Sequence, residues 1–395
     1  MKKSLFLIIL LAATGVVAAQ INFEQEEWSK VRKQAMKEGK IVFVDAYTTW
    51  CGPCKWMSKN VFTDASVGEF YNKNFINLKL DMEKGEGLVF AAEFEVNVYP
   101  TLLFVDSEGE LLHKHLGAIP ADQLITVGQD ALSPDKRLSS FMKKYESNKH
   151  DKEFLHDYIV KMLSAGYQVS EAADNYFTLL DNEEFVTRDN LMILQMWRPS
   201  SSSRAFDLLY KNRRGFIAIA GEEPVYGLLE GILTSDLYNS VAGDDPEAFH
   251  RVQSKVQSLD VPFKDKLASM GNMIYSESQS DMKGYLRHTS EYSKKYHWND
   301  WNTLNNLAWE MYLNEALQSP KEMKLARKLG KRAVKLESNY YTTDTYAATL
   351  FKSGKYSRAL EWANTAVDLA KKAAEDYSVT AELIENIHGA MKDQN

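Results

Sequence analysis

The feature that most constrains the fold is a Cys-Gly-Pro-Cys motif at residues 51–54, which contains the only two cysteines of the 395-residue chain. An apolar run at residues 41–47 precedes the motif and predicts a strand that is buried on both faces, with one carboxylate, Asp45, inside it. Residues 55–62, after the motif, are typical of the start of a helix. The two cysteines are therefore expected where a buried strand turns into a helix.

This position favours reactive sulfur chemistry. The first N–H groups of a helix have no intrahelical partner, and the helix dipole adds partial positive charge there. Both stabilise a thiolate, so we expect the pKa of Cys51 to lie below that of an ordinary cysteine. Pro53 suits the first helical turn because its missing N–H costs nothing there. An exposed Cys51 beside a sheltered Cys54 would suit thiol–disulfide exchange, in which one sulfur attacks a substrate disulfide and the other resolves the mixed disulfide.

Two structural interpretations of the cysteine pair compete with this one. In the first, the pair is a static structural disulfide, but closing so short a loop adds little stability. In the second, the pair is half of a zinc site, but zinc takes four ligands and the chain has no further cysteine. His113 and His115 are the only histidines in this part of the chain, and we interpret them as surface residues of an edge strand. We expect neither a metal nor a cofactor.

The first nineteen residues are typical of a secretory signal peptide. Lys2 and Lys3 precede an apolar run at residues 5–11, and small residues follow as far as Ala19. This pattern predicts cleavage before Gln20 and export of the protein, with the periplasm as the favoured compartment. We expect no membrane span in the mature chain. Thiols outside the cytosol tend to become oxidised, so the pair must act as an oxidant or depend on a separate electron donor.

Length and composition describe an ordinary globular protein of two or three domains. The formal net charge of −7 argues against a nucleic-acid partner, and no basic cluster stands out. Residues 20–133 predict an α/β domain whose sheet has one antiparallel edge. The expected helices are 23–37, 55–62, 65–73, 88–94 and 121–132, and the expected strands are 41–47, 75–81, 102–105 and 111–116.

Together these features resemble the thioredoxin family over residues 22–133. Residues 50–55 match the active-site motif of the family in full, and Asp45 stands six residues before the first cysteine, as the buried aspartate of the family does. The further matches are Lys79 near that aspartate, Tyr47 in place of a tryptophan, Tyr99-Pro100-Thr101 at the cis-proline segment, and Gly117 after the last strand. The resemblance implies a thioredoxin fold and a protein-disulfide oxidoreductase activity.

The resemblance also implies roles for single residues. Cys51 would be the nucleophile and Cys54 the resolving cysteine. Asp45, whose pKa burial should raise, would take a proton from Cys54 through water, with Lys79 as its supporting partner. The implied substrate-binding residues are Trp50, Gly52, Pro53, Tyr99 and Pro100. A cis Pro100 would present the backbone of Tyr99 to an extended substrate chain.

Beyond residue 133 the strand signals almost vanish, and apolar residues recur at helical spacing. We expect a helical region at 134–300. In residues 301–395, alanines repeat at a seven-residue spacing in a pattern that resembles tetratricopeptide repeats: Ala326 and Ala333, then Ala359 and Ala366. The predicted fold class is therefore an α/β thioredoxin fold followed by an all-α, helical-repeat solenoid.

Two functions fit these observations. The first is an exported thiol–disulfide oxidoreductase that exchanges disulfides with protein substrates. The Gly-Pro pair between the cysteines matches thioredoxin itself, which lies at the reducing end of the redox scale, so a reductase or isomerase is favoured over an oxidase. The second is an interaction or scaffold protein, in which the helical repeats hold a protein partner and the thioredoxin domain recruits clients or senses redox state.

Overall fold

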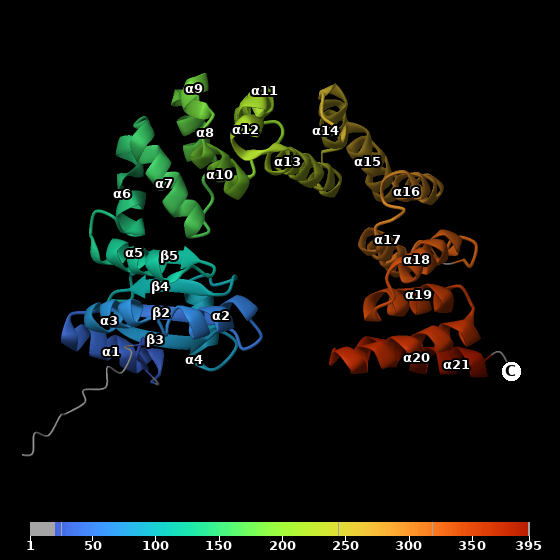
Figure 1. Ribbon diagram of the computed structural model, residues 1–395, viewed down its shortest axis with the longest axis horizontal. Helices are drawn as coiled ribbons and strands as arrows, with labels where there is room; N and C mark the ends of the chain where they lie inside the picture. The colour runs from blue at the N-terminus through green and yellow to red at the C-terminus, as the bar shows by residue number, and fades with distance from the viewer. Residues whose placement is uncertain (1–19, 25, 244, 318, 394–395) are drawn as a thin grey trace, which may run out of the picture. The chain divides into compact units, whose positions relative to one another are not determined.

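The computed structural model describes residues 20–24, 26–243, 245–317 and 319–393. The expected signal peptide at residues 1–19 lies outside the described residues. The chain forms two compact units, of which the first ends at Trp197 and the second begins at Arg198. Figure 1 shows the elements of both along the chain.

A five-stranded sheet forms the centre of the first unit, in the order β1-β3-β2-β4-β5 (Figure 1). The strands are β1 (Phe23–Glu24), β2 (Ile41–Tyr47), β3 (Phe75–Asp81), β4 (Thr101–Val105) and β5 (Leu111–Leu116). Strand β2 pairs in parallel with β3 and antiparallel with β4, which pairs antiparallel with β5. The predicted α/β sheet with an antiparallel edge is confirmed.

Five helices cover the two faces of this sheet. They are α1 (Trp28–Glu38), α2 (Gly52–Asn60), α3 (Ala65–Asn74), α4 (Glu86–Glu93) and α5 (Ala121–Leu132). Because side chains alternate along a strand, Phe43 of β2 packs into a core with α2, α3 and α5, whereas Val42 and Val44 pack into a second core with α1 and α4. This explains why β2 is apolar on both faces.

The prediction of a helix at residues 23–37 is wrong at its N-terminal end. Phe23 instead lies in β1 and pairs with Asn77 of β3. Its ring packs 5.2 Å from that of Phe62, centre to centre, so a tertiary contact fixes this segment as a strand. The helix α1 starts five residues later, at Trp28.

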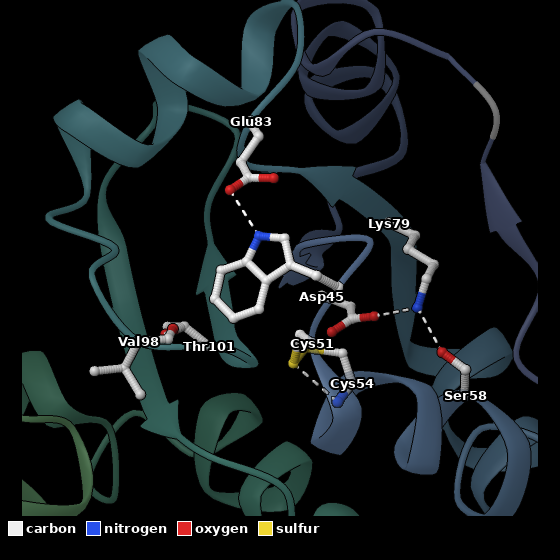
Figure 2. The surroundings of a disulfide bond; sticks show 9 residues. Asp45, Cys51, Cys54, Ser58, Lys79, Glu83, Val98 and Thr101 are labelled. Atoms are coloured by element: carbon white, nitrogen blue, oxygen red, sulfur yellow. Dashed lines mark hydrogen bonds and ion pairs between the residues drawn. A yellow bond between two sulfur atoms is a disulfide. The ribbon is translucent and has the colours of Figure 1, made fainter. Parts of the chain in front are cut away.

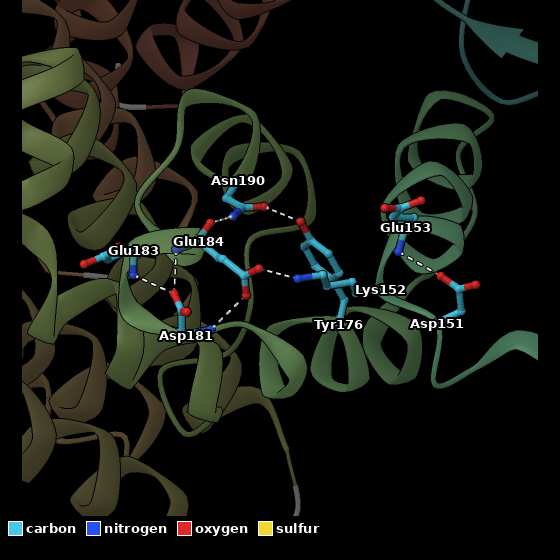
Figure 3. A network of polar contacts seen from close by, with 8 residues as sticks. All are labelled: Asp151, Lys152, Glu153, Tyr176, Asp181, Glu183, Glu184 and Asn190. Atoms are coloured by element: carbon cyan, nitrogen blue, oxygen red, sulfur yellow. Dashed lines mark hydrogen bonds and ion pairs between the residues drawn. The ribbon is translucent and has the colours of Figure 1, made fainter.

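Five further helices complete the first unit: α6 (Leu138–Asn148), α7 (Lys152–Ser164), α8 (Ser170–Leu179), α9 (Asn182–Phe185) and α10 (Arg188–Trp197). A polar network joins α7 to α10 (Figure 3). Lys152 pairs with Glu184, and the buried Asn190 accepts a hydrogen bond of 2.9 Å from the hydroxyl of Tyr176. The amide nitrogen of Asn190 donates to the carbonyl of Glu184, which completes the link.

Helices α6 and α7 pack against β5, the last strand of the sheet. The interpretation of His113 as a surface residue is therefore wrong: the residue is 4% exposed, and its Nδ1 accepts a hydrogen bond of 3.2 Å from the N–H of Leu138 at the start of α6. The sequence placed β5 correctly at an edge, but it gave no sign that a helix more than twenty residues later would cover it. His115 is half-buried beside it.

The second unit consists of helices in the described residues. They are α11 (Arg204–Lys211), α12 (Arg213–Ala220), α13 (Glu222–Ala242), α14 (Ala248–Ser258), α15 (Lys264–Ser278), α16 (Met282–Tyr296), α17 (Trp301–Leu313), α18 (Lys324–Leu336), α19 (Tyr340–Lys352), α20 (Tyr356–Ala373) and α21 (Ser378–Lys392). The repeated alanines of α18 and α20 are fully buried, as the repeat pattern predicts. A long run of paired, solenoid-like helices thus follows the α/β domain. Within the described chain, none of the helices combines the length and apolarity that crossing a bilayer requires.

Candidate active site

The two cysteines form a disulfide at the start of α2 (Figure 2). Cys51 is the N-cap residue of the helix, and its Sγ accepts a hydrogen bond of 3.1 Å from the N–H of Cys54. Pro53 lies in the first turn, where its ring fits and no N–H is needed. The first sulfur therefore lies against free helical N–H groups, which favour negative charge at that atom.

The expected contrast between an exposed Cys51 and a sheltered Cys54 is wrong for the disulfide form. The two residues are 3% and 2% exposed. Access to the sulfurs therefore depends on the side chains around them rather than on a projecting thiol. Among the described residues, no group of three or more His, Cys, Asp or Glu side chains is arranged to hold a metal.

Asp45 lies in the middle of β2, among the residues around the disulfide, and is completely buried (Figure 2). Its Oδ2 accepts a hydrogen bond of 2.6 Å from the ammonium of Lys79, the residue opposite it on β3. Its Oδ1 has no hydrogen-bond partner within the described structure. Burial raises the pKa of the Asp45 carboxyl, and the positive charge of Lys79 only partly opposes this rise. A carboxyl in this state can accept and return a proton.

Lys79 is held in place by more than Asp45. Its Nζ also donates a hydrogen bond of 2.8 Å to the hydroxyl of Ser58, and it lies 4.6 Å from the ring centre of Tyr47 and 5.2 Å from that of Phe62. Ser58 comes one helical turn after Cys54, and that spacing is the only sequence signal that could have identified it. Sequence reasoning missed its role.

A hollow of about 470 Å³ opens beside Cys54 and Lys79. Its lining residues are Tyr47, Thr48, Thr49, Cys54, Lys55, Ser58, Lys59 and Lys79. The hollow leads from solvent to Cys54 and to the ammonium of Lys79, which is bonded to Asp45. Water in it would contact Cys54 and the ammonium of Lys79, which is bonded to the buried carboxyl.

Trp50 covers the other side of the pair as an exposed, flat surface. The residue is 64% exposed, and its ring stands edge to face with that of Tyr99 at 5.9 Å between centres. Its Nε1 donates a hydrogen bond of 2.8 Å to Glu83, in the turn after β3 (Figure 2). Glu83 therefore fixes the indole, and it belongs to the residues that sequence reasoning missed.

The segment before β4 has the expected backbone conformation. The Tyr99–Pro100 peptide bond is cis, and the carbonyl of Pro100 accepts a hydrogen bond of 2.8 Å from the N–H of Gly117. No backbone hydrogen bond of Tyr99 occurs among the described residues. The ring contact with Trp50 places this segment beside the cysteines, and Gly52 has open space around its Cα. The residues proposed for substrate binding therefore surround one site.

Comparisons with known proteins match the part of the chain that holds this site. A family model for a thioredoxin-like domain matches residues 28–132. A thioredoxin of Aspergillus fumigatus is 39% identical over 101 residues, which cover 25% of this chain and 86% of that protein. Thioredoxin Y, chloroplastic, of Oryza sativa subsp. japonica is 30% identical over 117 residues, which are 30% of this chain and 66% of that protein. A solution structure titled as a putative disulphide-isomerase from Bacteroides thetaiotaomicron is 43% identical, over 29% of this chain and 96% of that one, with a TM-score of 0.28.

The chain therefore belongs to the thioredoxin family. Its N-terminal domain is a thioredoxin-like thiol–disulfide oxidoreductase domain with Cys51 and Cys54 as the redox pair. The family model ends at residue 132, so it describes this domain and not the helices from α6 onward.

Proposed function

We propose that the whole protein is an exported thiol–disulfide oxidoreductase that acts on protein substrates, as a reductase or isomerase rather than as an oxidase. The observation that carries the proposal is the disulfide at the N-terminus of α2, with the buried Asp45 among the residues around it (Figure 2). The signal-like residues 1–19 support export, and the Gly-Pro pair between the cysteines supports the reducing direction.

The first step begins from the reduced pair. The Cys51 thiolate, which the first N–H groups of α2 stabilise, attacks one sulfur of a substrate disulfide. A bond forms between Sγ of Cys51 and that sulfur, and the other substrate sulfur leaves as a thiolate that takes a proton from solvent. The product is a mixed disulfide on Cys51.

The second step releases the substrate. The carboxylate of Asp45 takes the proton of the Cys54 thiol through water in the hollow beside it. The Cys54 thiolate then attacks Sγ of Cys51, and the substrate sulfur leaves and is protonated. The substrate is thereby reduced by two electrons and the protein pair oxidised by two. A separate thiol or dithiol donor must return the pair to the reduced form.

Substrate binding would use the surface formed by Trp50 and the segment around Tyr99. An extended chain can form main-chain hydrogen bonds with the unpartnered backbone of Tyr99. The exposed indole of Trp50, held by Glu83, would support the side chains next to the substrate disulfide.

The test combines a potential with trapping. Equilibration of the Cys51–Cys54 pair with glutathione should give a reduction potential near that of thioredoxin, about −270 mV. Cys54→Ser should accumulate mixed disulfides on Cys51 that mass spectrometry can identify, whereas Cys51→Ser should trap none. A potential near −120 mV, as in strong oxidants, would reverse the proposed direction.

An interaction role is the second candidate function, and the extent of the helices favours it. Helices α6 to α21 take up residues 138–392, which is most of the described chain. A Cys51→Ser, Cys54→Ser double variant separates the two roles. If cells that carry the double variant keep the phenotype of the natural protein, the helical part is the functional one and the redox pair is secondary.

A further inference from the structure

A basic groove in the second unit lies outside the redox chemistry. It is formed by α16, by residues 321–322 and by the first part of α18. Helix α18 contains six lysine or arginine residues in thirteen and no aspartate or glutamate. The expectation of no basic cluster is therefore wrong for this segment. Apolar residues separate the cations in the sequence, and the net charge of −7 conceals them.

The fold gathers these cations on one surface. Ala326, Leu329 and Ala333 face inward and are fully buried, so the lysines of α18 point away from the core. The groove has a volume of about 330 Å³ and is lined by Leu286, Arg287, Lys321, Lys324, Leu325 and Lys328, together with Ser290 and Glu322. Two leucines thus lie among four cations.

The groove keeps a net positive charge within the part of the chain that the structure describes, because four cations and one carboxylate line it. None of Arg287, Lys321, Lys324 and Lys328 forms an ion pair there. Glu322 is the one carboxylate in the lining, and it accepts a hydrogen bond of 2.8 Å from the N–H of Ser319. A ligand with several carboxylates would therefore meet four cations that have no carboxylate partner in the described chain.

We propose that this groove binds an extended, acidic peptide segment of a partner protein. Carboxylates of the segment pair with Lys321, Lys324 and Lys328 in charge-assisted hydrogen bonds. An apolar side chain of the same segment covers Leu286 and Leu325, which adds burial to the charge pairing. The groove thus selects a sequence in which acidic and apolar residues alternate.

A membrane surface fits the groove less well than a peptide. Helices that bind to lipid surfaces insert large apolar side chains from one face. In the described chain, the large apolar residues that are strongly exposed lie on elements other than α16 and α18. These two helices therefore offer no such side chain for insertion. The leucines lie within a hollow, where a peptide side chain reaches them and a lipid bilayer does not.

The probe is a fluorescein-labelled peptide in which glutamate alternates with leucine, titrated into the purified protein. The reference peptide carries glutamine in place of glutamate. We expect the acidic peptide to bind at least about tenfold more tightly, with a dissociation constant that rises as salt is added. Equal binding of the two peptides would overturn the proposal. So would binding to vesicles with anionic lipid in the absence of peptide binding.

Charge reversal locates the site. Lys324→Glu with Lys328→Glu should weaken binding of the acidic peptide by about tenfold or more. The matched control is Lys331→Glu with Lys335→Glu, which changes the charge of the same helix equally at exposed residues outside the groove. The control should weaken binding less than about threefold. An equal loss in both double variants would mean general attraction rather than a groove, and would overturn the proposal.

Folding and redox function are checked separately. Circular dichroism establishes whether each variant is folded. If the Lys324→Glu, Lys328→Glu variant is unfolded, the Lys324→Gln, Lys328→Gln variant replaces it. This glutamine variant should also weaken binding of the acidic peptide. Reduction of insulin disulfides should be unchanged in the groove variants, because the cations lie in the second unit and the cysteines in the first. The binding result is thus independent of whether the proposed oxidoreductase function holds.

Discussion

Asp45 combines complete burial with a single ion-pair partner, and this combination controls its protonation. Only Oδ2 is bonded, to Lys79, while Oδ1 has no partner in the described structure. Burial favours the protonated carboxyl and the charge of Lys79 favours the carboxylate, with burial the larger effect. These opposed effects suit a group that both takes up and releases a proton.

Asp45→Asn should stabilise the disulfide form at neutral pH. The folded-state pKa of Asp45 is raised above its ordinary value of 3.8, so the free energy of unfolding of the natural protein falls as pH rises from that value through the folded-state pKa. Each unit of the rise corresponds to about 1.4 kcal/mol. Urea unfolding at pH 3 and pH 7 should therefore show the variant gaining stability only at the higher pH. A gain of the same size at both would contradict this account of the carboxyl. The variant should also reduce insulin more slowly.

Ser58→Ala should loosen Lys79. The variant removes one of two hydrogen bonds of the ammonium and should lower the free energy of unfolding by about 1 kcal/mol. Because Lys79 is then less firmly placed beside Asp45, the pH profile of insulin reduction should shift to higher pH. Ser29→Ala makes the same deletion at an exposed residue of α1 and should change neither property. An unchanged profile in Ser58→Ala would limit the serine to packing.

The residues that sequence predicted at this site are those whose position along the chain determines their position in space. Cys51, Cys54 and Asp45 lie on one strand-to-helix connection, and their spacing alone brings them together. Ser58 and Glu83 could not be predicted in this way. Their roles depend on where the ammonium of Lys79 and the indole of Trp50 come to lie, which the packing of separate elements decides.

Strand β5 and helix α6 form the joint between the sheet and the first helices. His113 is buried at this joint with its Nδ1 bonded to the first N–H of α6, and Lys114, also buried, donates to the carbonyl of Phe94. Burial, more than the nearby charge of Lys161, lowers the pKa of His113 to about 4. The sequence predicted the bounds of β5 but not this joint, because the periodicity of a strand does not reveal which distant helix packs on it.

Acid should weaken this joint. Since the pKa of His113 falls from 6.5 to about 4 on folding, the stabilisation of the neutral ring is fully present above pH 6.5 and is lost as pH falls toward 4. The free energy of unfolding of the first unit should decrease by about 3 kcal/mol over this range from His113 alone.

His113→Asn provides the comparison, because it keeps an acceptor for α6 but cannot take up a proton. Its free energy of unfolding should decrease less between pH 7 and pH 4 than that of the natural protein. His150→Asn removes an exposed histidine and serves as the control, with the full decrease retained. Parallel decreases in all three proteins would mean that His113 does not titrate with unfolding.

The two compact units should respond separately to reduction of the disulfide. Cys51 and Cys54 lie in the first unit, which ends at Trp197. Differential scanning calorimetry should resolve two unfolding transitions, and dithiothreitol should lower the midpoint temperature of only one of them. For so short a loop, the corresponding loss in the free energy of unfolding is about 2 kcal/mol. A control with the cysteines replaced by serine should show two transitions that dithiothreitol does not move. One shared transition that shifts as a whole would contradict the division.

The cover on β5 has a practical meaning for anyone who dissects this chain. Strands at the rim of a sheet present bare amide and carbonyl groups, which invite neighbouring molecules to add their own strands. Here α6 and α7 pack against β5, the strand at that rim, although the family model ends at residue 132. A fragment that ends at residue 132 would expose β5 and should aggregate in solution. The shortest soluble redox fragment should therefore extend to Trp197.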